Sequence, residues 1–240
     1  MIPLKDDVPS NSVPVVTVLL IALNVLAFLY QVSLGIDARG PAEGVQQAFM
    51  TEFGLVPCRL IGSCLGPEDF PSPVMTIFTS MFLHAGFAHI GGNMLFLWIF
   101  GDNVEDTLGH GRFLLFYLLS GVAAALVQTG LNPGGRLPMV GASGAISGVL
   151  GAYLLLFPYA RVLTLLILLP LPFVRFIHIP AMIVLGFWFL LQLLYATVSI
   201  GAQAAGRAES GGPAWFAHIG GFLAGILLLL MLRPRRSSRL

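Results

Sequence analysis

The chain has 240 residues, and its composition is that of a membrane protein. Hydrophobic residues make up 57% of the chain, charged residues make up 10%, and the formal net charge at pH 7 is +1. These values exclude an ordinary soluble domain, and without a strongly basic composition we expect no nucleic-acid partner. We therefore expect an all-α polytopic protein with the lipid bilayer around it.

Six apolar runs are long enough, or nearly long enough, to cross a bilayer. In chain order they cover residues 15–34, 87–100, 113–131, 142–157, 179–200 and 214–232. The first is too long for the core of a signal peptide, so we expect it to remain as a helix. The pattern predicts one six-helix membrane domain over residues 1–240, with a tail at 233–240. The piece at 162–174 is short and contains two prolines, so we interpret it as an interfacial hairpin, with a seventh span as the alternative.

The placement of Lys and Arg predicts the orientation, because cytoplasmic loops retain positive charge. With both termini in the cytoplasm, eight of the 12 basic residues lie on that side. These eight are Lys5, Arg112, Arg161, Arg175, Arg233, Arg235, Arg236 and Arg239, while Arg39, Arg59, Arg136 and Arg207 lie outside. We expect a multi-pass protein of the bacterial inner membrane whose second, fourth and sixth helices run from outside to inside.

The loop at residues 35–73 then lies outside and holds both cysteines of the chain, Cys58 and Cys64. An outer compartment is oxidising, and the spacing of the two residues permits a local disulfide. Two free thiols are the alternative.

Polar side chains are few in the apolar runs, and such groups indicate function unless a partner buries them. His89 and Asn93 are four apart and share one face of the second helix. Ser143 begins the fourth helix, and His218 lies near the start of the sixth. At a rise of about 1.5 Å per residue, all lie about 8–10 Å below the outer surface. Residues 142–157 would span only about 24 Å, so the fourth helix should begin recessed, beside a water-filled cavity.

These residues have the chemistry of a serine nucleophile and its base. A hydroxyl becomes reactive when a neighbouring base takes its proton, and neutral histidine does this near pH 7. Ser143 and His218 fit the two roles. The oxyanion formed on attack needs donors, which the start of the fourth helix, Asn93 and His89 can supply. As the alternative, Asn93 and His89 form an interhelical hydrogen-bonding pair.

Glycines around these residues also predict close helix packing. Small residues four apart let two membrane helices approach each other, which by itself is the commoner reason for a Gly-x-Ser-Gly sequence. We expect the fourth and sixth helices to touch through such glycines, which would bring His218 towards Ser143. The residues assigned to packing are Gly141, Gly144, Gly148, Gly221 and Gly225.

Four stretches, "FLHAGFAHIGGNM", "NVEDTLGHGRFLLFYLLSG", "GASGAISGVLGAY" and "AHIGGFLAG", resemble the rhomboid intramembrane serine proteases. The resemblance implies a dyad without a third carboxylate, with Ser143 as nucleophile and His218 as base and then acid. It implies an oxyanion hole made by the Ser143 backbone N–H, His89 and Asn93. The implied substrates are single-pass proteins that enter between the second and fifth helices and are cut near the outer end of their transmembrane helix.

No cofactor is implied, and we expect no metal, because no HExxH zinc motif occurs in the sequence. One position departs from the family pattern. Some members carry an aromatic residue four positions after the nucleophile, packed on the catalytic histidine, and here that residue is Ser147. Positioning of His218 is therefore expected from Phe222 or from the glycine contact. The leading hypothesis is an intramembrane serine endopeptidase, and the alternative is a catalytically inactive rhomboid-like protein that binds membrane clients.

Overall fold

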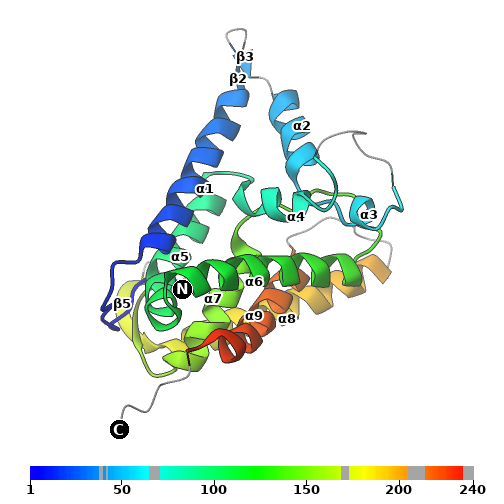
Figure 1. Ribbon diagram of the computed structural model, residues 1–240. Helices are drawn as coiled ribbons and strands as arrows, with labels where there is room; N and C mark the ends of the chain where they lie inside the picture. The colour runs from blue at the N-terminus through cyan, green and yellow to red at the C-terminus, as the bar shows by residue number, and fades with distance from the viewer. Residues whose placement is uncertain (38–39, 42, 65–70, 169–172, 205–213, 235–240) are drawn as a thin grey trace.

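The computed structural model of the chain describes residues 1–37, 40–41, 43–64, 71–168, 173–204 and 214–234. It is mostly helical (Figure 1). Within the described part of the chain, four helices are long and apolar enough to cross a membrane. They are α1 (Val15–Leu34), α6 (His110–Leu131), α8 (Ala181–Ala204) and α9 (Trp215–Leu232).

Two further elements depart from straight, full-length spans. The short helices α4 (Thr76–Thr79) and η1 (Ser80–Phe82) precede α5 (Phe87–Leu108), and the chain bends by 94° between them. Counted together as one bent span, they raise the number of candidate spans to five. Helix α7 (Ser143–Leu156) has 14 residues, or about 21 Å at the usual rise. A count of six spans is therefore not decided by helix length and composition.

The bounds of α5 and α6 differ from those expected because polar residues extend α5 beyond the apolar run. Helix α5 continues to Leu108, and α6 begins at His110. Between them Gly109 has a φ of +79°, a conformation that favours glycine and reverses the chain direction. Glu105 in the added turns is fully buried and accepts hydrogen bonds at the start of α1, from Val16 N (2.9 Å) and Thr17 N (2.8 Å).

The all-α expectation is incomplete, because the described residues include a three-stranded antiparallel sheet in the order β1-β4-β5. Its strands are β1 (Ile2–Lys5), β4 (Arg161–Leu168) and β5 (Phe173–Pro180). The hairpin expected at 162–174 is the β4–β5 pair, which extends to Pro180. Helix α8 therefore begins at Ala181 and not at 179. Val162 and Thr164 of β4 are fully buried, so one face of the sheet packs on the helices.

The segment expected as an outer loop at 35–73 also contains regular structure. Strands β2 (Ile36–Asp37) and β3 (Gly40–Pro41) pair with each other, and helices α2 (Glu43–Phe53) and α3 (Pro57–Leu60) follow. An isolated bridge pairs Leu55 with Met139, the segment just before α7. This part of the chain therefore packs beside the entrance to α7.

Helix α7 occupies the centre of the helical core. It lies behind α6 in the view of Figure 1 and packs mainly against α9 and α6. Every residue from Ala145 to Tyr153 is buried. A helix that is apolar all round is typical of such a central position. Its N-terminus, at Ser143, lies among residues of α4, α6 and α9.

Several expectations fall outside the described residues. These are the positions of Arg39, Arg207, Arg235, Arg236 and Arg239, the prolines Pro170 and Pro172, and most of the tail at 233–240.

Candidate functional site

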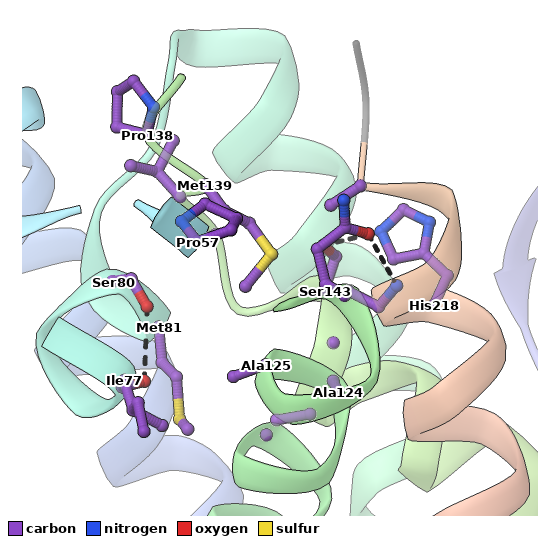
Figure 2. A pocket seen from close by; sticks show the side chains of 18 of the residues that line it. Pro57, Ile77, Ser80, Met81, Ala124, Ala125, Pro138, Met139, Ser143 and His218 are labelled. Carbon is purple, nitrogen blue, oxygen red and sulfur yellow. Dashed lines mark hydrogen bonds between the residues drawn. The ribbon is translucent and has the colours of Figure 1, made fainter. Parts of the chain in front are cut away.

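A cavity of about 510 Å³ lies at the N-terminus of α7. Its walls come from α4, η1 and α6, from residues 137–141, from the first turns of α5, α7 and α9, and from Pro57 of α3. Figure 2 shows Ser143 and His218 on one side of the cavity and Pro57, Pro138 and Met139 on the other. Helical segments from distant parts of the chain thus meet around one cavity.

Ser143 and His218 are in direct contact at this cavity. Ser143 Oγ and His218 Nε2 are 2.8 Å apart, although the residues are 75 positions apart in the chain (Figure 2). Ser143 is the first residue of α7, and His218 lies in the first turn of α9. A serine hydroxyl in hydrogen-bond contact with an imidazole nitrogen is the arrangement that nucleophilic catalysis requires.

The other ring nitrogen of His218 contacts Gln192, a residue that was not predicted from the sequence to belong to the site. His218 Nδ1 lies 2.8 Å from Oε1 of Gln192 on α8. An amide oxygen only accepts, so Nδ1 carries the proton and donates it to Gln192. Nε2 of a neutral ring is then unprotonated and accepts the hydrogen bond from the Ser143 hydroxyl. A glutamine within an apolar run was the available signal, because polar side chains there commonly bond across helices.

Aromatic rings surround His218, although Ser147 stands where some relatives have an aromatic residue. The Trp188 ring lies 5.9 Å from the His218 ring, between centroids, and the Trp215 ring lies 6.2 Å away, edge-on. Phe222 stacks on Phe189 at 4.5 Å and lies 6.2 Å from Trp188. Trp188 therefore packs against His218 in the position that was predicted for Phe222, and Phe222 packs against Trp188.

Ser147 itself points back along α7. Its Oγ donates to the carbonyl oxygen of Ser143 at 2.6 Å, and its side chain is fully buried. Its hydroxyl therefore bonds to the backbone of its own helix and does not face the cavity.

His89 lines the cavity with a defined tautomer. Its Nδ1 accepts a hydrogen bond from Ala85 N at 3.3 Å, so in the neutral ring the proton is on Nε2. Gly141 lies beside this nitrogen, because a Cβ built on Gly141 would be 2.8 Å from His89 Nε2. Gly141 also has a φ of +123°, which other residues rarely adopt. The glycine therefore leaves the Nε2–H of His89 accessible.

Asn93 brings a second donor to the same place. Its Nδ2 lies 3.5 Å from the Cβ position built on Gly141. This nitrogen is buried and has no hydrogen-bond partner among the described residues. Buried donors are usually paired, and Asn93 Nδ2 is one of eight buried side-chain atoms of the described residues without such a partner.

The start of α7 adds backbone donors. The residue before Ser143, Ala142, provides no side-chain cap to the helix. The first N–H groups of an α-helix have no partner inside the helix, and the helix dipole makes this end positive. The start of α7 therefore offers unpaired backbone N–H groups beside Ser143.

Of the five glycines predicted to pack, Gly144, Gly148, Gly221 and Gly225 lie where α7 and α9 touch, whereas Gly141 lies beside His89 and Asn93 of α5. A Cβ built on Gly221 would collide with the carbonyl oxygen of Gly144, and one on Gly225 with the carbonyl oxygen of Gly148. The helices therefore pack with their backbones in contact, next to Ser143 and His218.

Cys58 and Cys64 are joined by a disulfide in the structure. Cys58 N donates to the carbonyl oxygen of Gly135 at 3.0 Å, and the preceding residue, Pro57, lines the cavity. The bridge thus holds the turn that forms part of the cavity wall. Within the described ranges, no three His, Cys, Asp or Glu side chains gather as they would to hold a metal ion.

Residues 71–235 match a family whose model is described as "Rhomboid domain". The chain is 34% identical over 165 residues to Rhomboid protein 1, mitochondrial, of Saccharomyces cerevisiae, covering 67% of this chain and 42% of that protein. It is 34% identical over 144 residues to Rhomboid protease GluP of Bacillus subtilis, covering 60% and 25%. It is 35% identical over 103 residues to Rhomboid-type serine protease 2 of Emericella nidulans, covering 43% and 20%. The chain spans less than half the length of each of these relatives.

Proposed function

The chain belongs to the rhomboid family, and on this premise we propose that it is an intramembrane serine endopeptidase. Its apolar helices and its family make it an integral membrane protein. The proposed substrates are membrane proteins that are cleaved in or near a transmembrane segment. The observation that carries the proposal is the 2.8 Å contact between Ser143 Oγ and His218 Nε2 beside the cavity.

In the proposed reaction, Ser143 Oγ attacks the carbonyl carbon of the scissile peptide while its proton moves to His218 Nε2. The carbonyl oxygen becomes an oxyanion, which accepts hydrogen bonds from Asn93 Nδ2, His89 Nε2 and the Ser143 backbone N–H. His218 then gives its proton to the leaving amine, and the C–N bond breaks to leave an acyl-enzyme. Water attacks this ester with His218 again as base, and Ser143 is released with the second product.

The unpartnered Asn93 donor supports this assignment of roles. A donor that already had a strong partner in the free protein would have to break that bond before it could bind an oxyanion. Asn93 Nδ2 has no such bond within the described residues, so it is preorganised for the acceptor that forms during the reaction.

The proposed membrane arrangement has six crossings. The bent pair α4–η1 with α5 forms one crossing, and α7 forms another that begins recessed within the bilayer. Both termini are proposed to lie in the cytoplasm of a bacterial cell, with the protein in the inner membrane. Substrate helices are proposed to enter between α5 and α8.

A catalytically inactive protein that binds membrane clients is the alternative. It requires neither a serine in contact with a histidine nor an unpartnered donor beside that serine. The presence of both features favours the protease.

The test uses a serine-directed fluorophosphonate, applied to the purified protein in detergent beside a generic transmembrane substrate. We expect a covalent adduct on Ser143 Oγ, located by mass spectrometry, and cleavage of the substrate. Both should be lost in Ser143→Ala and in His218→Ala, and the double variant should be no worse, because the two residues act as a unit.

Ser147→Ala is the matched control, because it removes a serine one turn along the same helix and should keep the label. An adduct on Ser147, or cleavage by Ser143→Ala, would refute the assigned nucleophile. Substrate binding with neither labelling nor cleavage would favour the client-binding alternative.

A further inference from the structure

We propose that Gln192 is a positioning residue for His218, holding its ring in the tautomer and orientation that let Nε2 act as a base. The kinetic consequence rests on the proposed protease function, while the tautomer itself does not. The residue lies on α8, 26 positions before His218 in the chain.

The two ring nitrogens of His218 have contacts that require opposite hydrogen-bonding roles, one as donor and one as acceptor. Ser143 Oγ lies 2.8 Å from Nε2, and Gln192 Oε1 lies 2.8 Å from Nδ1. Only a ring with its single proton on Nδ1 satisfies both, since the amide oxygen must receive a hydrogen bond and the base nitrogen must be free. In the other tautomer, Nε2 would donate to Ser143 and would be unable to take its proton.

The orientation of the Gln192 amide is itself fixed. Its Nε2 donates to the carbonyl oxygen of Trp188, one turn earlier on α8, at 3.2 Å. Exchanging the amide oxygen and nitrogen would set two oxygens against each other at Trp188. Gln192 is only 5% exposed, so water does not compete freely for its oxygen. The amide therefore presents an acceptor to His218.

Helix α8 also holds the ring from the side. The Trp188 ring lies 5.9 Å from that of His218, so one turn of α8 supplies both an acceptor and a packing surface. This pair fulfils the positioning role for which Ser147 is too small. It also lies on a different helix from the aromatic residue that some relatives use.

A neutral acceptor suits a site enclosed by membrane helices. A carboxylate would favour the same tautomer, but burying its charge without a full set of partners is costly. An amide oxygen orients the ring without that cost. During attack on the substrate His218 becomes a cation, and the Gln192 dipole, already aligned with the Nδ1–H, stabilises the charge as it forms. The effect therefore falls on the chemical step and not on substrate binding.

Two substitutions of equal length separate the acceptor from the rest of the side chain. Gln192→Met keeps the length and removes the acceptor. Gln192→Glu keeps an oxygen at the same place, whether the carboxyl is ionised or protonated. The ionised form removes the donor to Trp188, whereas the protonated form keeps an O–H that can donate there. We expect Gln192→Met to lower kcat by about 3- to 15-fold with KM unchanged, the loss expected for one neutral hydrogen bond. Gln192→Glu should return kcat to within about 3-fold of wild type.

The tautomer is read directly by ¹⁵N NMR on protein labelled at histidine, which has five such residues. The His218 signals are assigned by their loss in His218→Ala. The measurement is made on the protein with Ser143 intact and without substrate, so it needs no proteolysis. We expect Nδ1 to be protonated and Nε2 unprotonated, and we expect Gln192→Met to shift His218 towards the Nε2–H form.

Each outcome decides the proposal. Protonation of His218 on Nε2 in the protein with Gln192 intact would overturn it, as would a Gln192→Met variant with the same tautomer and kcat. A fall in kcat that Gln192→Glu does not recover would mean that α8 packing, and not the acceptor, is responsible. If Gln192→Met does not fold, two measurements still test the proposal. They are the tautomer of His218 in the protein that has Gln192 and the kcat of Gln192→Glu. Failure of the protease assignment appears separately, as loss of cleavage with the tautomer intact.

Discussion

Gly221 on α9 lies directly against the carbonyl oxygen of Gly144 on α7, next to Ser143 and less than one turn from His218. Gly225 and Gly148 repeat the contact one turn further along. The spacing between the two helices is therefore set by backbone atoms, which cannot move aside as a flexible side chain can. This spacing is what places His218 Nε2 at 2.8 Å from Ser143 Oγ.

Gly221→Ala tests the dependence of the site on this contact. The added methyl group would overlap the Gly144 carbonyl, so α9 must move away from α7. Overpacking of this kind costs about 1–3 kcal/mol, which thermal unfolding in detergent measures. We also expect kcat to fall by at least about 10-fold, because small displacements of reacting groups are costly.

Gly186→Ala on α8 is the control, since its Cβ would meet nothing within 4 Å. It should leave both the unfolding temperature and kcat near their wild-type values. Wild-type behaviour of Gly221→Ala in both measurements would show that the contact is looser than the structure has it.

Asn93→Ala tests the oxyanion role. Asn93 Nδ2 has no partner to lose among the described residues, so we expect little change in the unfolding temperature. If the nitrogen binds the oxyanion, kcat should fall by about 10- to 1000-fold with little change in KM. We expect the lower part of this range, because His89 and the Ser143 N–H share the charge, and a larger loss when His89 is replaced as well.

The same variant also tests the alternative in which Asn93 and His89 form an interhelical hydrogen-bonding pair. If Asn93 mainly ties α5 to its neighbours, Asn93→Ala should unfold at a lower temperature, yet have wild-type kcat when assayed cold. That result would remove Asn93 from the proposed oxyanion hole and leave Ser143 and His218 in their roles.

Glu105→Ala tests how α1 is attached to the bundle. The buried Glu105 carboxylate accepts hydrogen bonds from Val16 N, Thr17 N and Thr17 Oγ1, at 2.9, 2.8 and 2.7 Å. Removing it takes the partner from these three donors and also from His110 Nδ1, which lies 2.6 Å from Glu105 Oε1. We therefore expect a loss of about 3 kcal/mol or more in stability. Hydrogen exchange should increase first at Val16 and Thr17. Glu105→Gln, which keeps one acceptor oxygen, should lose less, and an equal loss would mean that the charge and not the bonding matters.

Asp6 predicts a pH dependence of stability. It lies before α1, outside the membrane spans, and burial raises the pKa of its carboxyl above the ordinary value. The folded protein then binds this proton more tightly than the unfolded chain does. The stabilisation that comes from protonated Asp6 is therefore complete below the ordinary pKa of the carboxyl. It is lost as the pH rises through the raised pKa of Asp6 in the folded protein.

Asp6→Asn should remove this dependence, because the amide stays neutral while its oxygen still accepts from the Tyr153 hydroxyl. The measurement is the unfolding temperature of both proteins in detergent from about pH 3.5 to 7. The difference, variant minus wild type, should increase as the pH rises. A difference that is constant with pH would show that Asp6 titrates alike in the folded and unfolded chains.

The sequence was sufficient wherever the physical signal is local. A long apolar run predicts a membrane helix because every residue in it must favour lipid, and α1 has the expected bounds of Val15–Leu34. The family resemblance in four stretches is confirmed by the match over residues 71–235. The sequence also placed Ser143 at the start of a short helix, which is where α7 begins.

The sheet was only partly predictable. Prolines at 170 and 172 indicated a break in the apolar run, so a hairpin was expected. Strand structure was not, because apolar residues occur on both faces of β4 and β5 and leave no two-residue alternation to detect. Pairing of β4 with β1 joins residues that are far apart in the chain, such as Ile2 and Leu165, and no local pattern reports it.

The partner of His218 was decided by tertiary structure alone. The sequence by itself determined that this is a membrane protein of the rhomboid family, and it provided the residues proposed for the dyad. Which side chain of α8 reaches His218 Nδ1 depends on how α8 is rotated about its axis and how it crosses α9. Those two angles are set by packing along both helices, and hydropathy and spacing within one helix contain no information about them. Gln192 and Trp188 meet His218 because that packing turns one particular face of α8 towards α9.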